Sequence, residues 1–199
     1  MDERKQERPS LELLRMELAR EELKHEFWKT LWHIAGIITV AAAITALLAT
    51  RLVMLLKVNG MSMAPTLQEG EIVILHQTKK IEKGDMMGFY YGGKVLLKRA
   101  IGSAGDYIDI DQEGNVYVNG EMLEEPYLER KGPGKCELDF PYQVPEGMIF
   151  VLGDNREVSL DSRIRAIGCV ESSQIVGRVA CRVWPLARME MMRTDTELE

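Results

Sequence analysis

The chain has 199 residues, of which 46% are hydrophobic and 28% charged, and its formal net charge is −6. This composition is typical of a folded protein and argues against a disordered chain, a collagen or a coiled-coil rod. The acidic balance argues against nucleic-acid binding, which depends on a basic surface. Three scattered histidines and three cysteines without a CxxC pattern predict no metal site and no disulfide framework, but a single bridge between Cys169 and Cys181 stays open.

An uncharged stretch of 21 residues runs from Thr30 to Thr50, and 16 of them are apolar or Gly. The apolar pattern resumes after Arg51 and stops at Lys57. About 20 residues in a helix cross a bilayer core of about 30 Å. We therefore predict a transmembrane anchor at residues 30–56.

Two other readings of this stretch are less consistent with its length. A buried helix of a soluble protein would need a core to surround it, and the chain is small for that. A cleavable signal peptide would have a shorter apolar core and fewer residues before it. Residues 1–29 are predicted to form a charged helical segment that begins near Pro9-Ser10 and continues into the anchor.

Basic residues predict the orientation of the anchor. Seven Lys or Arg side chains precede the span, and only Arg51 and Lys57 follow it closely. The positive-inside bias then places residues 1–29 in the cytoplasm and the rest of the chain, from Lys57 onward, outside.

The outer part is predicted to be a mainly β domain of about 140 residues, because short β-prone runs alternate there with turns rich in Gly, Asp, Asn and Pro. Residues 187–199 are predicted to be a polar tail. The β-prone runs are Ile72 to Leu75, Met86 to Tyr91, Val95 to Leu97, Val116 to Val118, Met148 to Leu152 and Val176 to Val183.

The segment from Gly88 to Lys94 fits the G-x-x-x-x-G-K pattern of phosphate loops, but Val95 stands where such a loop needs Ser or Thr. It also lies between two β-prone runs. We predict a hairpin turn at Gly92-Gly93 and no nucleotide site.

Ser62 lies in the segment Asn59-Gly-Met-Ser-Met-Ala-Pro-Thr-Leu67, directly after the predicted anchor. Gly60 and Pro65 predict a turn or loop that exposes Ser62. A serine in a loop is usually only a turn residue, so its companions decide whether it is functional.

Lys98 ends an apolar run that begins at Val95. A buried lysine loses solvation, which lowers its pKa from about 10.4 toward neutrality and provides a free amine as a general base. A lysine at a sheet edge that points into solvent is the alternative.

A third segment, Gly153-Asp-Asn-Arg-Glu-Val-Ser-Leu-Asp-Ser-Arg163, combines hydroxyls with charges of both signs. Asp161 can pair with Arg163, and Ser159 can hydrogen-bond a neighbouring amine. A calcium loop is disfavoured because Arg156 follows the first Asp and no regular ligand series continues.

Together these segments resemble the type I signal peptidases, membrane-bound Ser/Lys endopeptidases that remove signal peptides from exported proteins. The resemblance covers about residues 30–186 in order. Besides the anchor and the three segments above, it rests on Lys83-Gly-Asp85, Leu97-Lys-Arg-Ala-Ile-Gly-Ser-Ala-Gly-Asp106, Ile175-Val-Gly-Arg-Val179 and Trp184-Pro185.

The resemblance implies a role for each candidate residue. Ser62 matches the nucleophile, Lys98 the general base, and Ser159 the hydroxyl that orients the lysine. Asp161 and Arg163 match a supporting pair. Family members can carry a side-chain hydroxyl two residues before the nucleophile; Gly60 stands there in this chain, so backbone N–H groups are expected to form the oxyanion hole.

The resemblance further implies a catalytic β domain at residues 57–186 with a small inserted β segment, here 105–147, as short as in Gram-positive members. It implies no metal and no cofactor. The expected partners are preproteins bearing signal peptides, cut after small residues in an Ala-x-Ala pattern, and the lipid bilayer. An inactive homologue that binds extended peptides and a relative dedicated to one partner stay open; a self-cleaving repressor would carry a DNA-binding domain.

Overall fold

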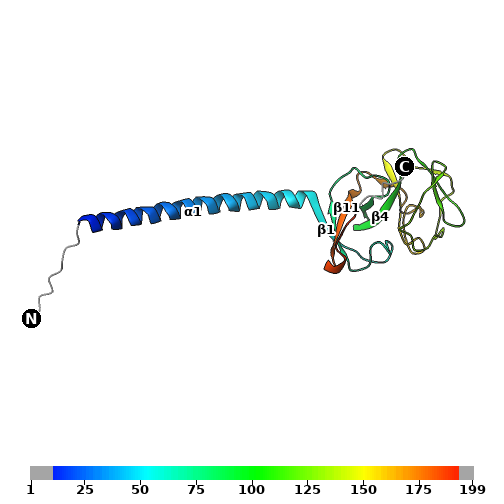
Figure 1. Ribbon diagram of the computed structural model, residues 1–199. Helices are drawn as coiled ribbons and strands as arrows, with labels where there is room; N and C mark the ends of the chain where they lie inside the picture. The colour runs from blue at the N-terminus through cyan, green and yellow to red at the C-terminus, as the bar shows by residue number, and fades with distance from the viewer. Residues whose placement is uncertain (1–10, 193–199) are drawn as a thin grey trace, which may run out of the picture. The chain divides into compact units, whose positions relative to one another are not determined.

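The computed structural model describes residues 11–192, and the chain divides into two compact units between Thr50 and Arg51. The described part of the first unit, residues 11–50, belongs to the helix α1, and the second unit contains the β domain (Figure 1). The predicted helix start at Pro9-Ser10 lies outside the described residues.

The helix α1 runs without interruption from Leu11 to Leu52, so the charged segment and the apolar stretch form one helix as predicted. Its polar first half carries ion pairs one turn apart, such as Lys24 Nζ to Glu21 Oε1 at 2.7 Å. The stretch Arg15–Leu47 is long and apolar enough to cross a membrane, judged by length and composition. This helix is consistent with a membrane anchor.

The β domain contains two antiparallel sheets. The larger sheet has the strand order β1-β2-β11-β3-β4-β9-β10, with β12 paired to β11. Its strands are β1 (Val53–Lys57), β2 (Ile72–His76), β3 (Met86–Tyr91), β4 (Lys94–Ser103), β9 (Met148–Leu152), β10 (Val170–Glu171), β11 (Ile175–Trp184) and β12 (Glu190–Met191).

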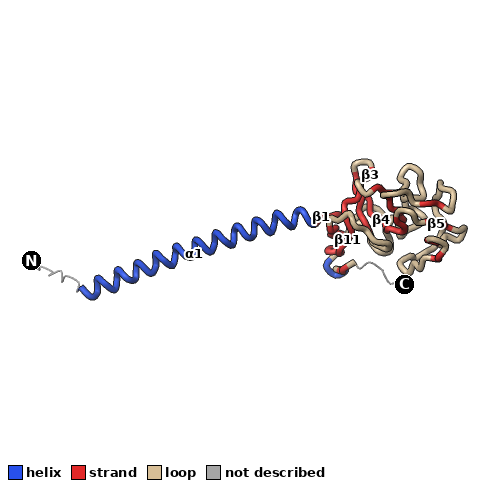
Figure 2. Tube along the Cα trace, turned by 90° about the horizontal axis from the view of Figure 1, so that it is seen from above, coloured by secondary structure: helices blue, strands red, loops and turns tan. Residues whose placement is uncertain are grey.

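The smaller sheet has the order β7-β6-β5-β8 and lies within the segment 105–147 that the resemblance implied as an insertion. Figure 2 shows β1 and β5 at opposite ends of the β domain, with β4 between them. The strands of this sheet are β5 (Tyr107–Ile110), β6 (Val116–Val118), β7 (Glu121–Met122) and β8 (Tyr142–Gln143).

Three clusters of buried apolar side chains form the core of the β domain. One gathers side chains of β1, β2, β4 and β11 around Leu75, the second lies around Phe89 and Val151, and the third joins the smaller sheet to β9 through Ile108 and Phe150. A Cβ at Gly88 of β3 would lie 2.5 Å from Cδ2 of Leu75 in β2. Glycine at this position therefore lets the backbone of β3 lie close to the Leu75 side chain.

Two expected boundaries were wrong. The anchor was expected to end at residue 56, but Val53–Lys57 is the strand β1, which pairs with β2. The apolar side chains of β1 alternate between core and solvent, so they serve the sheet and not the span. Residues 187–192 were expected to belong to a tail, but they contain part of the 3-10 helix η1 (Leu186–Arg188) and the strand β12. The remainder of that segment lies outside the described residues.

The hairpin turn predicted at Gly92-Gly93 is confirmed, because both residues have positive φ and join β3 to β4. The three cysteines are free thiols.

Candidate active site

Ser62 and Lys98 come together although they lie 36 residues apart in the chain, with Lys98 Nζ 2.7 Å from Ser62 Oγ. Lys98 stands opposite Met87 in the ladder between β4 and β3 and is only 3% exposed. Ser62 is half-buried in the turn that follows β1. The alternative of a solvent-facing lysine at a sheet edge was therefore wrong.

The turn that carries Ser62 is fastened on both sides. Met63 and Leu67 are buried in the cluster around Leu75, so the turn is tied to the sheet by apolar packing. On the other side, the Asn155 N–H donates to the Ser62 carbonyl at 3.0 Å. This anchoring fixes the serine backbone and leaves its hydroxyl beside the lysine.

Burial sets the charge state of Lys98. Loss of solvation lowers the pKa of Lys98 from 10.5 to about 8, although the carboxylates of Asp161 and Asp154 raise it and Arg163 lowers it further. At pH 7 about one tenth of a group with such a pKa is an unprotonated amine. A neutral amine at hydrogen-bond distance from a hydroxyl can accept its proton.

Ser159 lies close to this pair without joining it. Its Oγ is buried and has no hydrogen-bond partner among the described residues, so the expected bond from Ser159 to Lys98 is absent. A Cβ on Gly153 would overlap Ser159 Oγ and lie 2.5 Å from the Ser62 carbonyl oxygen. Gly153 is therefore the spacer that allows the loop from 153 to 159 to lie against the Ser62 turn.

Asp161 and Arg163 form the pair that the sequence suggested. Arg163 Nε and Nη2 donate to the two carboxylate oxygens of Asp161, each at 2.9 Å, and both side chains are buried. Asp161 Oδ2 also accepts the Gly153 N–H at 3.0 Å. The pair thus holds the backbone of Gly153 while its carboxylate lies near enough to affect the pKa of Lys98.

Sequence reasoning missed a second carboxylate, Asp154. It accepts two bonds from Arg99, Nε at 2.9 Å and Nη2 at 2.7 Å, and a third from Thr66 Oγ1 at 2.6 Å. Arg99 is the neighbour of Lys98 and Thr66 belongs to the Ser62 turn. Asp154 therefore ties the two halves of the site together. The available signal was Arg99 itself, because an arginine in an apolar strand requires a carboxylate partner.

A further group reaches the site from the inserted segment. The Tyr127 ring lies 3.8 Å from the Arg99 guanidinium carbon, and its hydroxyl donates to Glu125 Oε1 at 2.8 Å. Glu125 in turn is ion-paired with Arg156, whose Nε donates to the Gly153 carbonyl at 3.2 Å. The insertion is thus connected to the Ser159 loop by buried charges.

Gly60 has a φ of 81°, in the left-handed region that favours glycine, and no atom lies within 4 Å of where its Cβ would be. Because residue 60 is glycine, this chain has no side-chain donor there, and any other residue would need a strained backbone at this position. Within residues 11–192, no group of three or more His, Cys, Asp or Glu side chains is arranged to hold a metal ion.

A serine hydroxyl held by a buried lysine amine on an antiparallel β domain defines the class of Ser/Lys hydrolases. Residues 31–184 match the family described as "Signal peptidase, peptidase S26". The chain belongs to this family of serine endopeptidases, and it has signal peptidase I activity by homology.

Signal peptidases of two Gram-positive bacteria are similar to this chain, in agreement with the resemblance. Signal peptidase IB of Staphylococcus aureus is 35% identical, over 77% of this chain and 89% of that protein. Signal peptidase I of Bacillus caldolyticus is 39% identical, over 64% of this chain and 78% of its own length. A crystal structure of a signal peptidase I from Enterococcus faecalis V583 is 31% identical, covers 50% of this chain and 96% of that one, and has a TM-score of 0.43.

Proposed function

We propose that this protein cleaves N-terminal signal peptides from exported preproteins after small residues, with Ser62 as nucleophile and Lys98 as general base. The observation that carries the proposal is the 2.7 Å contact between Lys98 Nζ and Ser62 Oγ, made by a lysine whose pKa burial lowers to about 8.

In the acylation step, Ser62 Oγ attacks the carbonyl carbon of the residue before the cut while Lys98 Nζ accepts the hydroxyl proton. The tetrahedral intermediate then expels the amine of the mature protein, which takes that proton from Lys98. In the second step, Lys98 removes a proton from water, and the resulting hydroxide attacks the acyl carbon. The bond to Ser62 Oγ then breaks, Ser62 Oγ takes the proton back from Lys98, and the signal peptide is released. No metal or cofactor takes part in this scheme.

The remaining candidates support these two groups. Asp161 and Arg163 hold Gly153 and hence the loop beside Ser62. Ser159, whose buried hydroxyl has no hydrogen-bond partner among residues 11–192, would accept a bond from the charged Lys98 amine during the reaction. The oxyanion is stabilised by backbone N–H groups, including that of Ser62, because Gly60 offers no side-chain donor.

The helix α1 anchors the enzyme in a lipid bilayer. The excess of basic residues before the apolar stretch favours a cytoplasmic N-terminus and an extracytoplasmic β domain. Signal peptides are themselves apolar, so the same bilayer presents them to the enzyme.

Cleavage of a preprotein whose signal ends in Ala-x-Ala, by the detergent-solubilised full chain, tests the proposal. We expect a cut after the second Ala by the wild type and none by Ser62→Ala. A folded wild type that leaves this substrate intact would point to a dedicated partner or to a binding function. Equal cutting by both proteins would remove Ser62 from the mechanism.

A further inference from the structure

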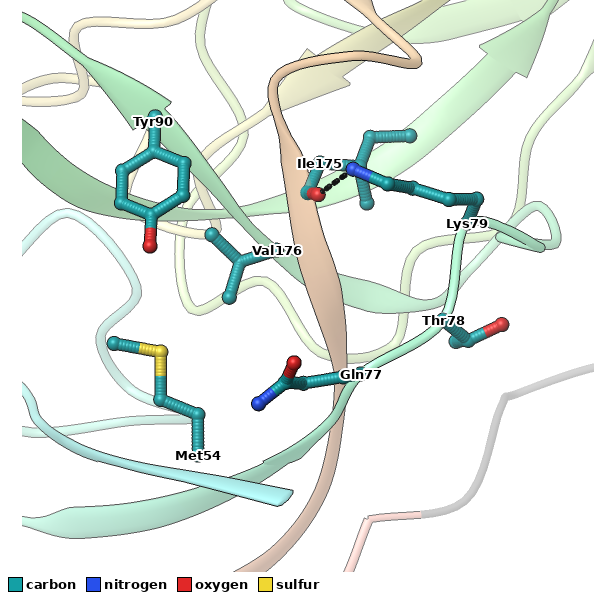
Figure 3. A pocket seen from close by; sticks show the side chains of 7 residues that line it. All are labelled: Met54, Gln77, Thr78, Lys79, Tyr90, Ile175 and Val176. Carbon is teal, nitrogen blue, oxygen red and sulfur yellow. Dashed lines mark hydrogen bonds between the residues drawn. The ribbon is translucent and has the colours of Figure 1, made fainter. Parts of the chain in front are cut away.

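A cavity of about 430 Å³ opens in the β domain away from Ser62 and Lys98, neither of which lines it. In Figure 3, the Tyr90 hydroxyl, the Met54 thioether and the Gln77 amide converge on Val176 of β11. The lining residues are Met54, Gln77, Thr78, Lys79, Tyr90, Ile175 and Val176.

Two strands have an edge without a partner strand among the described residues: β1, which contributes Met54 to the cavity lining, and β4, which pairs with the strand that carries Tyr90. The strand β1 ends the order of the larger sheet, so one of its edges is open. The strand β4 pairs with β3 from Lys94 to Arg99 but with β9 only from Arg99 onward, which leaves its other edge open before Lys98. An extended peptide can pair with open edges of this kind.

The strands β1 and β4 connect the surroundings of the cavity with the Ser62–Lys98 pair. Near the pair, Val58 and Leu97 belong to one apolar cluster. Farther along, Met54 of β1 lines the cavity, and so does Tyr90, the ladder partner of Val95. Three to four residues of extended chain, at about 3.3 Å each, separate the two places by about 10–13 Å.

A substrate that pairs with β1 in parallel runs in the chain direction of β1, from Met54 in the cavity lining toward Ser62. In this orientation, residues before the cut run from the cavity toward Ser62.

We propose that this cavity is a subsite for the fifth residue before the cleaved bond. Side chains of an extended peptide alternate between two faces, so the fifth residue shares the face of the first and third residues before the cut. This inference rests on the proposed function and extends it to a second determinant of substrate choice.

The lining indicates which side chain fits. Met54 and Val176 provide an apolar floor, and the Tyr90 hydroxyl and Gln77 amide provide a polar rim. No Asp or Glu lines the cavity, and the Lys79 amine at its border donates to the backbone carbonyls of Ser173 and Ile175. A large uncharged side chain such as Leu or Met matches this chemistry, whereas a Lys side chain would find no carboxylate.

The test uses the full chain in detergent and peptides that all end their signal in Ala-x-Ala. A single Leu replaces Gly at each position from the fourth to the eighth residue before the cut, and kcat/KM is compared with the all-Gly reference. We expect about a five- to tenfold gain for Leu at position five, from partial burial of the side chain, and no gain at positions four and six. Equal gains at neighbouring positions would overturn the subsite, because partitioning into detergent does not alternate.

Two neighbouring substitutions sharpen the test. Gln77→Trp fills the cavity and should bring the ratio of Leu to Gly peptides close to one. His76→Trp places the same bulk on the exposed neighbour that does not line the cavity, and it should keep the wild-type ratio. An unchanged ratio in Gln77→Trp would overturn the proposal. If the reference peptide is cut equally by Ser62→Ala, or by no variant, the proposed function fails first and the subsite falls with it.

Discussion

Replacing Lys98 by Met should abolish cleavage and, at neutral pH, make the fold more stable. The lysine is 3% exposed, and burial lowers its pKa from 10.5 to about 8. Methionine has a similar length, no charge and flexible torsions, so it can occupy the same space. The lysine that catalysis requires is therefore a source of instability when it is charged.

The magnitude follows from linkage. The pKa of Lys98 is lower in the folded state than in the unfolded state, so the unfolded chain holds the proton more tightly. Wild-type stability consequently rises with pH between about 8 and 10.5, by about 3 kcal/mol at about 1.4 kcal/mol for each tenfold difference in proton affinity. Lys98→Met lacks this dependence, so its advantage is greatest below pH 8 and fades toward pH 10.5.

Pulse proteolysis in urea of the detergent-solubilised full chain, at pH 7, 8, 9 and 10, measures the free energy of unfolding of both proteins. Their difference should shrink as the pH rises. Lys94→Met is the matched control, because Lys94 begins the same strand and is exposed, and it should behave like the wild type at every pH. A constant difference between Lys98→Met and the wild type would refute the account of a lysine destabilised by burial.

Three more predictions concern activity. The kcat/KM of the wild type should rise with pH, with a midpoint near 8. In Asp161→Asn this midpoint should lie at lower pH, because a carboxylate that raises the pKa of Lys98 is gone. A pH–rate profile in which the midpoint stays or rises contradicts this. Lys98→Arg should lose activity yet keep its fold, since arginine stays protonated; circular dichroism beside the cleavage assay checks both, and an active variant would exclude Lys98 as base. Gly153→Ala should lower kcat at least about 100-fold and cost about 1–3 kcal/mol of stability, because its Cβ would overlap Ser159 Oγ. Gly132→Ala is the control: its Cβ would meet nothing within 4 Å, so it should change neither the cleavage rate nor the free energy of unfolding.

Local sequence signals were sufficient for most of the larger sheet and for β6 of the smaller sheet. Short β-prone runs bounded by glycine turns predicted β3, β6 and β9 with the bounds that the structure has. The strand β1 was not predicted, because its apolar residues follow the uncharged stretch closely and resemble a continuation of the anchor. Only the pairing with β2 makes them a strand. The strands β7, β8, β10 and β12 have two residues each, too few for any periodicity.

The contact between Ser62 and Lys98 could be expected only through the family resemblance, because no local pattern shows that residues 36 apart meet. Asp161 and Arg163 were predictable as a pair because they are two residues apart. The partnership of Arg99 with Asp154 spans 55 residues, and that of Arg156 with Glu125 spans 31. Such long-range pairs depend on how the strands assemble, which a single sequence does not display.

The ion pair between Glu125 and Arg156 bears on the evolution of this domain. Both side chains are almost fully buried, so losing one partner leaves the other as an unpaired buried charge. This costs about 3–5 kcal/mol, which is a large part of the free energy of unfolding of a small domain. Residues 105–147 therefore cannot be deleted or exchanged for a different insertion without also changing Arg156. Lineages that lengthen this segment are expected to keep Glu125 and Tyr127, because the Tyr127 ring lies against Arg99 of β4 and its hydroxyl donates to Glu125.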